Sequence, residues 1–374
     1  MTDSQATSQA AAPRAGAKRV AVTLVAALTV GYGLVTTILL LADLVMDKQL
    51  PAIEMFNMLM PSVLFPLFAL ALICLLLRQW RPALAALPAL IAFIVYYGPL
   101  LAPKSIAAPE GARELSVLTY NLHAEWSQFE PMAALIREAN ADVVALQELG
   151  APAAQYFAER LSELYPYQAL HTDSQEFIIG QGVLSRYPIV EDRYLTEKYG
   201  QQRTVLDVGG RRVVLYNVHP TAPFARQSGT LVFDAQDRGA SLHSVLELAA
   251  RETDPLILAG DFNMTDRTAD YARVTERYRD AFRQTGQGLG FTLPDYSTPQ
   301  AFAFAVRLPD WLKLSWLPVP LLTRIDYVFH NEAFASLDAK VWPTSGGSDH
   351  RPVFARLALL EDGEPGETRR IEPN

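Results

Sequence analysis

Three long stretches near the start of the chain carry no charged residue, and they limit the fold more than any other feature. They cover residues 20–42, 55–77 and 82–101. Each approaches the roughly 20 apolar residues that an α-helix needs to cross a bilayer. None has the polar face that a 3.6-residue period gives to a surface helix, which argues against buried soluble helices. We therefore predict three transmembrane helices.

The first stretch could instead belong to a cleaved signal peptide. Its apolar run is longer than the roughly 7 to 15 residues of such a peptide, and two further runs follow it. A membrane span is therefore the better explanation of this stretch.

Lysine and arginine residues predict the orientation of the spans, because positive residues in short loops stay in the cytoplasm. Arg14, Lys18 and Arg19 precede the first stretch, and Arg78 and Arg81 separate the second from the third. The charged residues in the loop between the first two stretches are mostly acidic: Asp43, Asp47 and Glu54, with Lys48. Both basic segments can therefore lie in the cytoplasm together, and three crossings place the rest of the chain in the periplasm or outside the cell.

This orientation divides the chain into five segments. Residues 1–19 form a cytoplasmic tail, residues 20–101 the membrane helices, and residues 102–114 a linker rich in Ala and Pro. Residues 115–359 form the exported domain, and residues 360–374 a disordered tail with charged and Pro/Gly-containing composition.

Composition narrows the class of the exported domain. The only cysteine, Cys74, lies in the second apolar stretch, so the exported domain can form no disulfide. The 374 residues have a net charge of −8, and the part after residue 101 is more acidic, with 26 basic and 36 acidic side chains. An acidic surface disfavours tight nonspecific binding of nucleic acid, whose affinity comes mainly from contacts between cations and phosphates.

Strand-like runs and amphipathic helical stretches alternate from Leu115 onward. The helical stretches cover residues 131–138, 151–161 and 238–251, and such alternation indicates a layered α/β architecture. Gly209 and Gly210 join two strand-like runs, which predicts an antiparallel hairpin. We therefore expect mixed sheets.

Polar residues follow several of these strands at the point where each ends. Asp261 and Asn263 end the apolar run that starts at Pro255, Asn121 ends an alternating run, and Glu148 follows a continuous one. Reacting groups gather at strand ends in open α/β sheets. The sequence therefore predicts a site at one sheet edge.

The order of these polar endings resembles that of the endonuclease/exonuclease/phosphatase family of divalent-metal phosphoesterases. The resemblance covers about residues 115–357 and implies a four-layer α/β sandwich, with the site at one edge of two packed sheets. The motifs that carry it are TYN (119–121), LQE (146–148), NVH (217–219), GDFN (260–263), RIDY (324–327) and SDHRP (348–352).

Hydrolysis of a phosphate ester needs a cation, an oriented water and donors for the charge that develops on the phosphoryl oxygens. Glu148 offers a carboxylate and Asn121 a carbonyl oxygen, and such ligands suit Mg²⁺. The resemblance implies the same ligands and adds Asp349. Mn²⁺ or Ca²⁺ would also suit these donors. The structural alternatives are a solvated loop acid for Glu148 and a turn-capping amide for Asn121.

Asp261 is the candidate general base, or the group that holds the attacking water in line. Asn263 would orient that water or bond to a phosphoryl oxygen. An ionised aspartate beside a metal-bound water gains reactivity from its position, because the cation already lowers the pKa of the water. An Asx turn that caps the next helix is the structural alternative, and both roles can hold together.

His219 and His350 resemble the phosphate-contacting histidines of the family. Asp349 and His350 are adjacent, so in an extended backbone their side chains point to opposite faces and His350 needs another carboxylate. The resemblance implies that Asp326 fills this role, and an edge-strand acid is the alternative. Surface or core positions are expected for the other histidines, which are His123, His171, His243 and His330.

The segment from Thr292 to Arg324 departs from a compact family pattern, and Trp311, Leu314, Trp316 and Leu317 make part of it strongly apolar. Tryptophan favours the membrane interface, so this segment could dip into the outer leaflet. It could equally cover the domain's own core or pack on the membrane helices.

Three functions fit these observations. We favour a membrane-anchored, Mg²⁺-dependent phosphodiesterase that acts outside the cytoplasm on a phosphoester, such as a lipid or glycolipid head group. An extracytoplasmic nuclease is the alternative, disfavoured by the acidic charge and by the lack of an evident basic and aromatic stripe. A catalytically silent binding module is the third. The sequence indicates no protein partner.

Overall fold

The computed structural model describes most of the chain. The described residues are 12–102, 104, 106–109, 111–123, 129–172, 180–195, 201–227, 230–295, 306–307, 318–319 and 322–361. The chain divides into two compact units, Met1–Pro99 and Leu100–Asn374. The predicted membrane contact of Trp311 and Trp316 lies outside the described residues, as does nearly all of the predicted disordered tail.

The first unit is helical, and it contains the three apolar helices that the sequence predicts. Three stretches are long and apolar enough to cross a membrane: Gly16–Val45, Pro51–Leu76 and Trp80–Leu101. Apolar side chains such as Leu44 and Leu76 are exposed on the helix surfaces, as is typical of helices that a membrane surrounds. The helices are α1 (Ala12–Val45), α2 (Pro51–Leu76), α3 (Trp80–Ala83), η1 (Leu84–Ala86) and α4 (Leu87–Leu101).

Small residues let the helices of this unit approach closely. A Cβ atom on Gly33 of α1 would lie 2.5 Å from the carbonyl oxygen of Ala85 in η1. Close approach through small residues is a common way to pack helices in membranes. Thr29 of α1 and the buried Cys74 of α2 also meet, with 3.2 Å between Oγ1 and Sγ.

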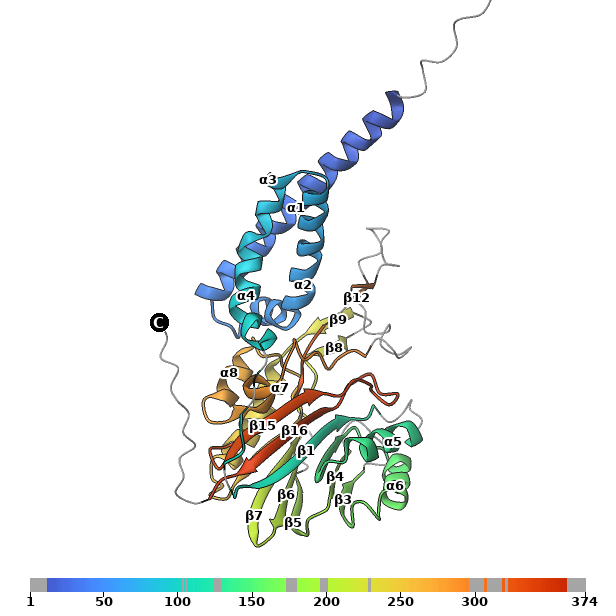
Figure 1. Cartoon of the computed structure of the whole chain (residues 1–374), viewed down its shortest axis with the longest axis vertical. Coiled ribbons are helices and arrows are strands. Elements are labelled where there is room, and N and C mark those ends of the chain that lie inside the picture. Colours follow the sequence, from blue (N-terminus) through green and yellow to red (C-terminus); the bar gives the residue numbers. More distant parts are fainter. Residues whose placement is uncertain are drawn as a thin grey trace, which may run out of the picture. The chain divides into compact units, whose positions relative to one another are not determined.

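The second unit contains two six-stranded sheets (Figure 1). The first sheet has the order β15 (Phe334–Val341), β16 (Val353–Leu359), β1 (Arg113–Asn121), β2 (Val143–Gln147), β4 (Gln181–Ser185) and β3 (Tyr167–His171). The second sheet has the order β11 (Arg279–Asp280), β14 (Asp326–His330), β10 (Leu256–Asp261), β7 (Arg211–Val218), β6 (Gln201–Val208) and β5 (Ile189–Leu195). Two small two-stranded antiparallel sheets accompany them: β8 (Phe224–Gln227) with β9 (Thr230–Phe233), and β12 (Val306–Arg307) with β13 (Pro318–Val319).

Both sheets are mixed, as the sequence predicts. In the first sheet only β1 and β2 are parallel, and in the second sheet only β7 and β10 are parallel. The predicted hairpin joins β6 to β7, with Val208 opposite Arg211. Gly209 and Gly210 have φ values of 62° and 90°, which suit a two-residue turn whose central residues both need positive φ.

Side chains that alternate along the strands build three apolar layers. Val117 of β1 points into the core between the sheets, whereas its neighbour Leu118 packs in the outer core beneath helices. The outer helices are α5 (Phe129–Ala139) and α6 (Ala151–Arg160) on the first sheet, and α7 (Gln236–Ala249) and α8 (Ala269–Thr275) on the second. The short α9 (Ala281–Thr285) contributes to the core between the sheets. This arrangement confirms the predicted four-layer α/β sandwich (Figure 1).

Buried amides replace apolar side chains between the sheets toward the ends of β2 and β7. Gln147 Nε2 donates to Asn217 Oδ1 at 2.7 Å. Asn217 Nδ2 in turn donates to the backbone oxygen of Leu146 at 2.8 Å and lies 3.4 Å from Gln202 Oε1. Because Glu148 directly follows Gln147, this layer of hydrogen bonds joins the two sheets next to the predicted site.

Candidate active site

The two sheets bring the predicted acids to one edge through their strand register. Asn121 is the last residue of β1 and lies beside Gln147, so Glu148 follows at the same edge. In the second sheet Asp261 ends β10 and pairs in register with Asp326, the first residue of β14. Four polar side chains from distant parts of the chain therefore gather there.

The loop that follows β15 completes the site. Ser348 Oγ donates to the backbone oxygen of Asn121 at 2.8 Å and accepts from the backbone N–H of His350 at 3.0 Å. These bonds attach the loop to the end of β1. Asp349 and His350 are consequently buried at the same edge.

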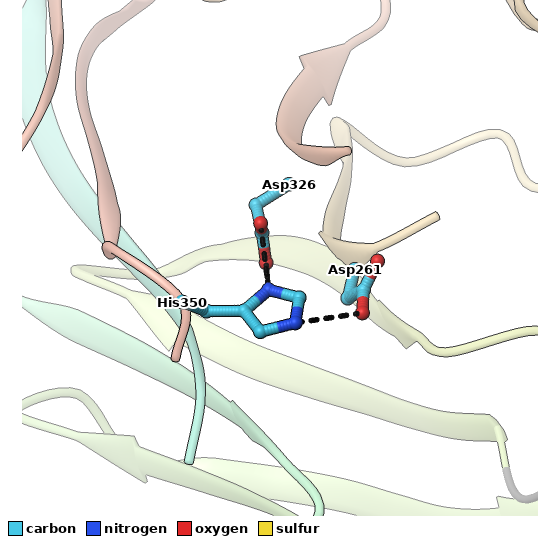
Figure 2. Close-up of side chains that lie close together, drawn as sticks. All are labelled: Asp261, Asp326 and His350. Atoms are coloured by element: carbon cyan, nitrogen blue, oxygen red, sulfur yellow. Dashed lines mark hydrogen bonds and ion pairs between the residues drawn. The ribbon is translucent and has the colours of Figure 1, made fainter. Parts of the chain in front are cut away.

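His350 lies between two buried carboxyl groups (Figure 2). Its Nδ1 atom is 3.0 Å from Asp326 Oδ2, and its Nε2 atom is 3.8 Å from Asp261 Oδ2. Asp326 thus contacts His350 as the sequence predicts, and the contact fixes the plane of the ring. The catalytic roles of these residues stay predictions.

Burial and neighbouring charges shift the pKa values in this group. Burial raises the pKa of Asp261, and with the added charge of Asp326 and the opposing charge of two histidines the value is about 6. Burial by itself would lower the pKa of His350, but Asp326 and Asp261 outweigh it and raise that pKa well above its ordinary value. A protonated imidazole therefore lies next to a carboxylate that can still take up a proton near neutral pH.

Asp261 also shapes the turn that carries Asn263. Its Oδ1 atom accepts from the backbone N–H of Asn263 at 2.9 Å, which is the Asx turn expected as a structural alternative. Asn263 has a φ of 51° and its Nδ2 atom donates to the backbone oxygen of Pro220 at 3.0 Å. The turn places Asn263 beside the segment that follows His219, within the predicted site.

Glu148 is the centre of a second group of contacts. Its Oε1 atom accepts from Asn121 Nδ2 at 3.0 Å and lies 3.6 Å from His219 Nε2. His219 Nε2 is also 3.7 Å from Asp261 Oδ2, so it lies between both groups of acids. Glu148 has a φ of 53°, and non-glycine residues held in this region are concentrated at functional sites.

The predicted ligands fit a divalent cation. Among the described residues, no lysine or arginine lies within 4.0 Å of the carboxylate of Glu148 or Asp349. The basic side chains near them in the described part of the chain are histidines, His123 beside both carboxylates and His219 beside Glu148. The two carboxylates and the amide of Asn121 are hard donors of the kind that Mg²⁺ prefers. Their role as metal ligands stays a prediction.

Asp261, Asp326 and His350 are spaced so that they too could hold a cation, since each offers an atom within 4.8 Å of the others. In this group His350 itself supplies the positive charge, and its Nδ1 atom is already occupied by Asp326. A cation near Glu148, and proton transfer by this group, stay predictions.

His123 differs from its expected surface or core position. Its Nδ1 atom lies 3.5 Å from Glu148 Oε2 and 3.7 Å from Asp349 Oδ2. A lone histidine two residues after Asn121 gave no signal of this, because the contact with Asp349 depends on the tertiary fold.

The other histidines lie outside this cluster, in line with their expected structural roles. His171 pairs with Asp192 at 2.5 Å, and His243 is exposed and lies 3.3 Å from Glu247. His330 is buried and bonds to a serine hydroxyl and a backbone oxygen, and burial lowers its pKa to about 4.

Arg238 is a second residue that the sequence did not single out. It is fully buried, its Nε and Nη2 atoms donate to Asp270 Oδ2 at 2.9 and 2.8 Å, and Nη1 donates to the backbone oxygen of Asn263 at 3.1 Å. It thereby supports the turn that begins at Asp261. The sequence signal that could have identified Arg238 is its position on the inward face of an amphipathic helix, where an arginine needs a buried partner.

Two mixed sheets with acids, amides and histidines at a shared edge define a class of α/β-sandwich proteins. The model of the Endonuclease/Exonuclease/phosphatase family matches residues 118–350, and the chain belongs to this family. No curated protein matches the chain.

Several solved structures are similar to this chain. TDP2 from D. rerio, in a complex with a single-strand DNA product, has a TM-score of 0.51 and 18% identity, over 65% of this chain and 98% of that chain. Humanized D. rerio TDP2 has a TM-score of 0.49 and 20% identity, over 65% of this chain and 98% of that chain. An endonuclease/exonuclease/phosphatase from Beutenbergia cavernae has a TM-score of 0.48 and 22% identity, over 66% of this chain and 72% of that chain.

Proposed function

We propose that the protein is a membrane-anchored, divalent-metal-dependent phosphodiesterase that acts outside the cytoplasm on a phosphodiester carried by a lipid head group. One observation carries the hydrolytic part of this proposal. Asp261, Asp326 and His350 converge within 4.8 Å at the sheet edge that also holds Glu148. Family membership supports a phosphoric ester as the bond that is cleaved.

Each side chain has a task in this reaction. Asp261, whose Oδ2 atom also accepts from Asn121 Nδ2 at 3.1 Å, positions the attacking water and takes its proton. His350 and His219 donate to the phosphoryl oxygens as negative charge develops there. A bound cation would withdraw electron density from the phosphoryl group and lower the pKa of a water molecule.

Asn263 and Asp326 act on the groups beside them. Asn263 is held by Pro220 and by the Asx turn, so it presents a fixed amide next to the water position. Asp326 holds His350 in one ring orientation and favours its protonated form. Preorganised donors of this kind act without reorganisation when the reaction occurs.

The membrane helices support a lipid-borne substrate. The last helix ends at Leu101 and β1 begins at Arg113, and a fully extended connection of this length spans no more than about 40 Å. The connection therefore tethers the start of β1 to the last span, which supports a substrate carried by the bilayer. The positive-inside rule supports a location outside the cytoplasm, because Arg78 and Arg81 fall between the second and third spans.

A nuclease is the second candidate. The similar D. rerio TDP2 structure holds a single-strand DNA product, which favours this candidate. The net negative charge of this chain disfavours a nuclease, because nucleic-acid affinity comes mainly from contacts between cations and phosphates. A silent binding module has less support, since every predicted site residue is present and all lie at one sheet edge.

The experiment that tests the proposal uses the full-length protein in detergent micelles or liposomes with added Mg²⁺. Phospholipids, single-stranded DNA and bis(4-nitrophenyl) phosphate serve as substrates, and Asp261→Asn is the matched variant. We expect phospholipid cleavage by the wild type and a loss of activity in the variant. Cleavage of DNA alone would favour the nuclease, and no cleavage of any substrate would favour the binding module.

A further inference from the structure

We propose that His123 supplies a nitrogen ligand to the cation held by Glu148 and Asp349, and that the site therefore binds Mn²⁺ more tightly than Mg²⁺. The inference rests on the proposed metal dependence and adds a residue and a metal preference to it. The carboxylates alone would predict a site for Mg²⁺.

The position of the imidazole carries this inference. His123 Nδ1 lies 3.5 Å from Glu148 Oε2 and 3.7 Å from Asp349 Oδ2. These distances exceed those of ordinary N–H···O hydrogen bonds. Ligands at about 2.1 Å from one ion lie roughly 3.0 to 3.4 Å from each other, so a small movement of the three side chains would bring them to a shared ion.

The backbone holds the imidazole in this place. The backbone N–H of His123 donates to Asn121 Oδ1 at 3.1 Å, and the φ of His123 is 42°. This turn directs the side chain back toward the end of β2. Positive φ is uncommon for residues other than glycine, so a local requirement for this conformation is indicated.

His123 and His350 differ in their contacts with acids. His350 makes a close hydrogen bond to Asp326 at 3.0 Å and is buried, as expected of a histidine that pairs with an acid. His123 lies near two acids, at 3.5 and 3.7 Å, and its side chain is 23% exposed. An exposed position at the rim of the site allows a hydrated cation to enter.

The donor atoms determine which metal such a site prefers. Carboxylate and amide oxygens suit Mg²⁺, Ca²⁺ and Mn²⁺, whereas imidazole nitrogen suits transition metals. Of the metals that oxygen donors already accept, Mn²⁺ is the one that gains from a nitrogen ligand. The site should therefore favour Mn²⁺ over Mg²⁺.

The test measures metal binding by the full-length protein in detergent, without substrate. Free Mn²⁺ is counted by electron paramagnetic resonance, competition with Mg²⁺ gives the affinity ratio, and spin-echo spectra detect nitrogen bound to Mn²⁺. His123→Asn is the central variant because asparagine tolerates positive φ, and His123→Gly is a second variant that keeps the same backbone. His219→Asn and the surface variant His243→Asn are matched controls.

We expect a nitrogen signal from the wild type that disappears in both His123 variants and persists in both controls. Loss of an outer partner of a metal ligand lowers affinity about 10- to 100-fold, so loss of a ligand should weaken Mn²⁺ binding by at least about tenfold. Binding of Mg²⁺ should change less.

Two failures can be told apart. If Mn²⁺ binds, Glu148→Gln abolishes the binding and His123→Asn leaves the affinity and the nitrogen signal unchanged, the inference about His123 is overturned and the proposed function stands. If neither Mn²⁺ nor Mg²⁺ binds to the wild type, the proposed metal dependence fails with it.

Discussion

The Nδ1 atom of His350 lies 3.0 Å from a carboxylate oxygen of Asp326, and both side chains are buried. This contact leaves the opposite ring nitrogen directed at Asp261, 3.8 Å away. Asp326 therefore orients the imidazole, and Asp326 and Asp261 together favour its charged form.

Replacement of this carboxylate should slow the reaction without much effect on substrate binding. In Asp326→Asn the imidazole of His350 loses the carboxylate that accepts from Nδ1 and favours its protonated form. We therefore expect kcat to fall by about 10² to 10⁴-fold, with KM changed little. Steady-state kinetics on bis(4-nitrophenyl) phosphate measure both constants. Asp338→Asn, on β15, is the matched control and should keep the wild-type kcat. Equal kcat values for the two variants would contradict the role of Asp326.

The rate should fall at acidic pH because the carboxyl of Asp261 must be ionised to accept a proton. Its pKa is about 6, raised by burial and by Asp326. The value of kcat/KM should therefore decrease about tenfold per pH unit below this value. A bound cation would move the midpoint to lower pH. A profile that rises as pH falls from 7 to 5 would exclude Asp261 as the base.

The same shift predicts that Asp261 destabilises the folded protein at neutral pH. A carboxyl whose pKa is higher in the folded state than its unfolded value of about 3.9 lowers stability as pH rises from about 4 to 6. Asp261→Asn removes this effect, so we expect stabilisation on the order of 1 to 3 kcal/mol at pH 8.

Thermal unfolding of the full-length protein in detergent, without added metal, checks this prediction. Tryptophan fluorescence should show a higher apparent Tm for Asp261→Asn than for the wild type at pH 8, and no difference near pH 4. A lower Tm for the variant at pH 8 would mean that the contacts of the carboxylate outweigh its burial.

Removal of the metal should abolish activity, and the loss should be reversible. Glu148 and Asp349 have no lysine or arginine in contact among the described residues, so a cation is the expected partner of both. Excess chelator should stop hydrolysis and added Mg²⁺ should restore it. Glu148→Gln should require at least about tenfold more Mg²⁺ for half of its maximal rate. Full activity in chelator would refute a metal-dependent reaction.

The orientation in the membrane can be tested by chemical labelling. In a Cys74→Ser background, we expect Glu247→Cys, in the domain that follows the spans, to react with a membrane-impermeant maleimide added to intact cells. Arg78→Cys, between the second and third spans, should react only after the cells are opened. The reverse pattern would place the catalytic domain in the cytoplasm.

The sequence predicted the elements of the site whose signals are local. Asn121, Glu148 and Asp261 each follow a strand that can be recognised from its apolar pattern, and strand ends share an edge in such sheets. The hairpin at Gly209 was equally local. These signals, with the family resemblance, were sufficient for the four-layer fold.

The contacts that sequence did not predict depend on distances between remote segments. His123 meets Asp349 only because Ser348 bonds to the end of β1. Arg238 of α7 donates to the backbone oxygen of Asn263 and also pairs with Asp270 of α8, which holds its side chain in place. The residue pattern of one segment does not indicate a hydrogen bond to a remote segment. The roles of His123 and Arg238 could therefore be recognised only in the structure.

Asn217 belongs to one sheet, yet its amide donates to the backbone oxygens of Leu146 and Gly182 in the other, at 2.8 and 3.2 Å. If the two sheets slid past one another, both bonds would break in a place that water does not reach. The hydrogen bonds of Asn217 therefore hold Glu148 and Asp261, one from each sheet, at a constant separation. The proposed reaction, which needs a cation and a base at a fixed spacing, would gain its accuracy from the bonds that join the two sheets.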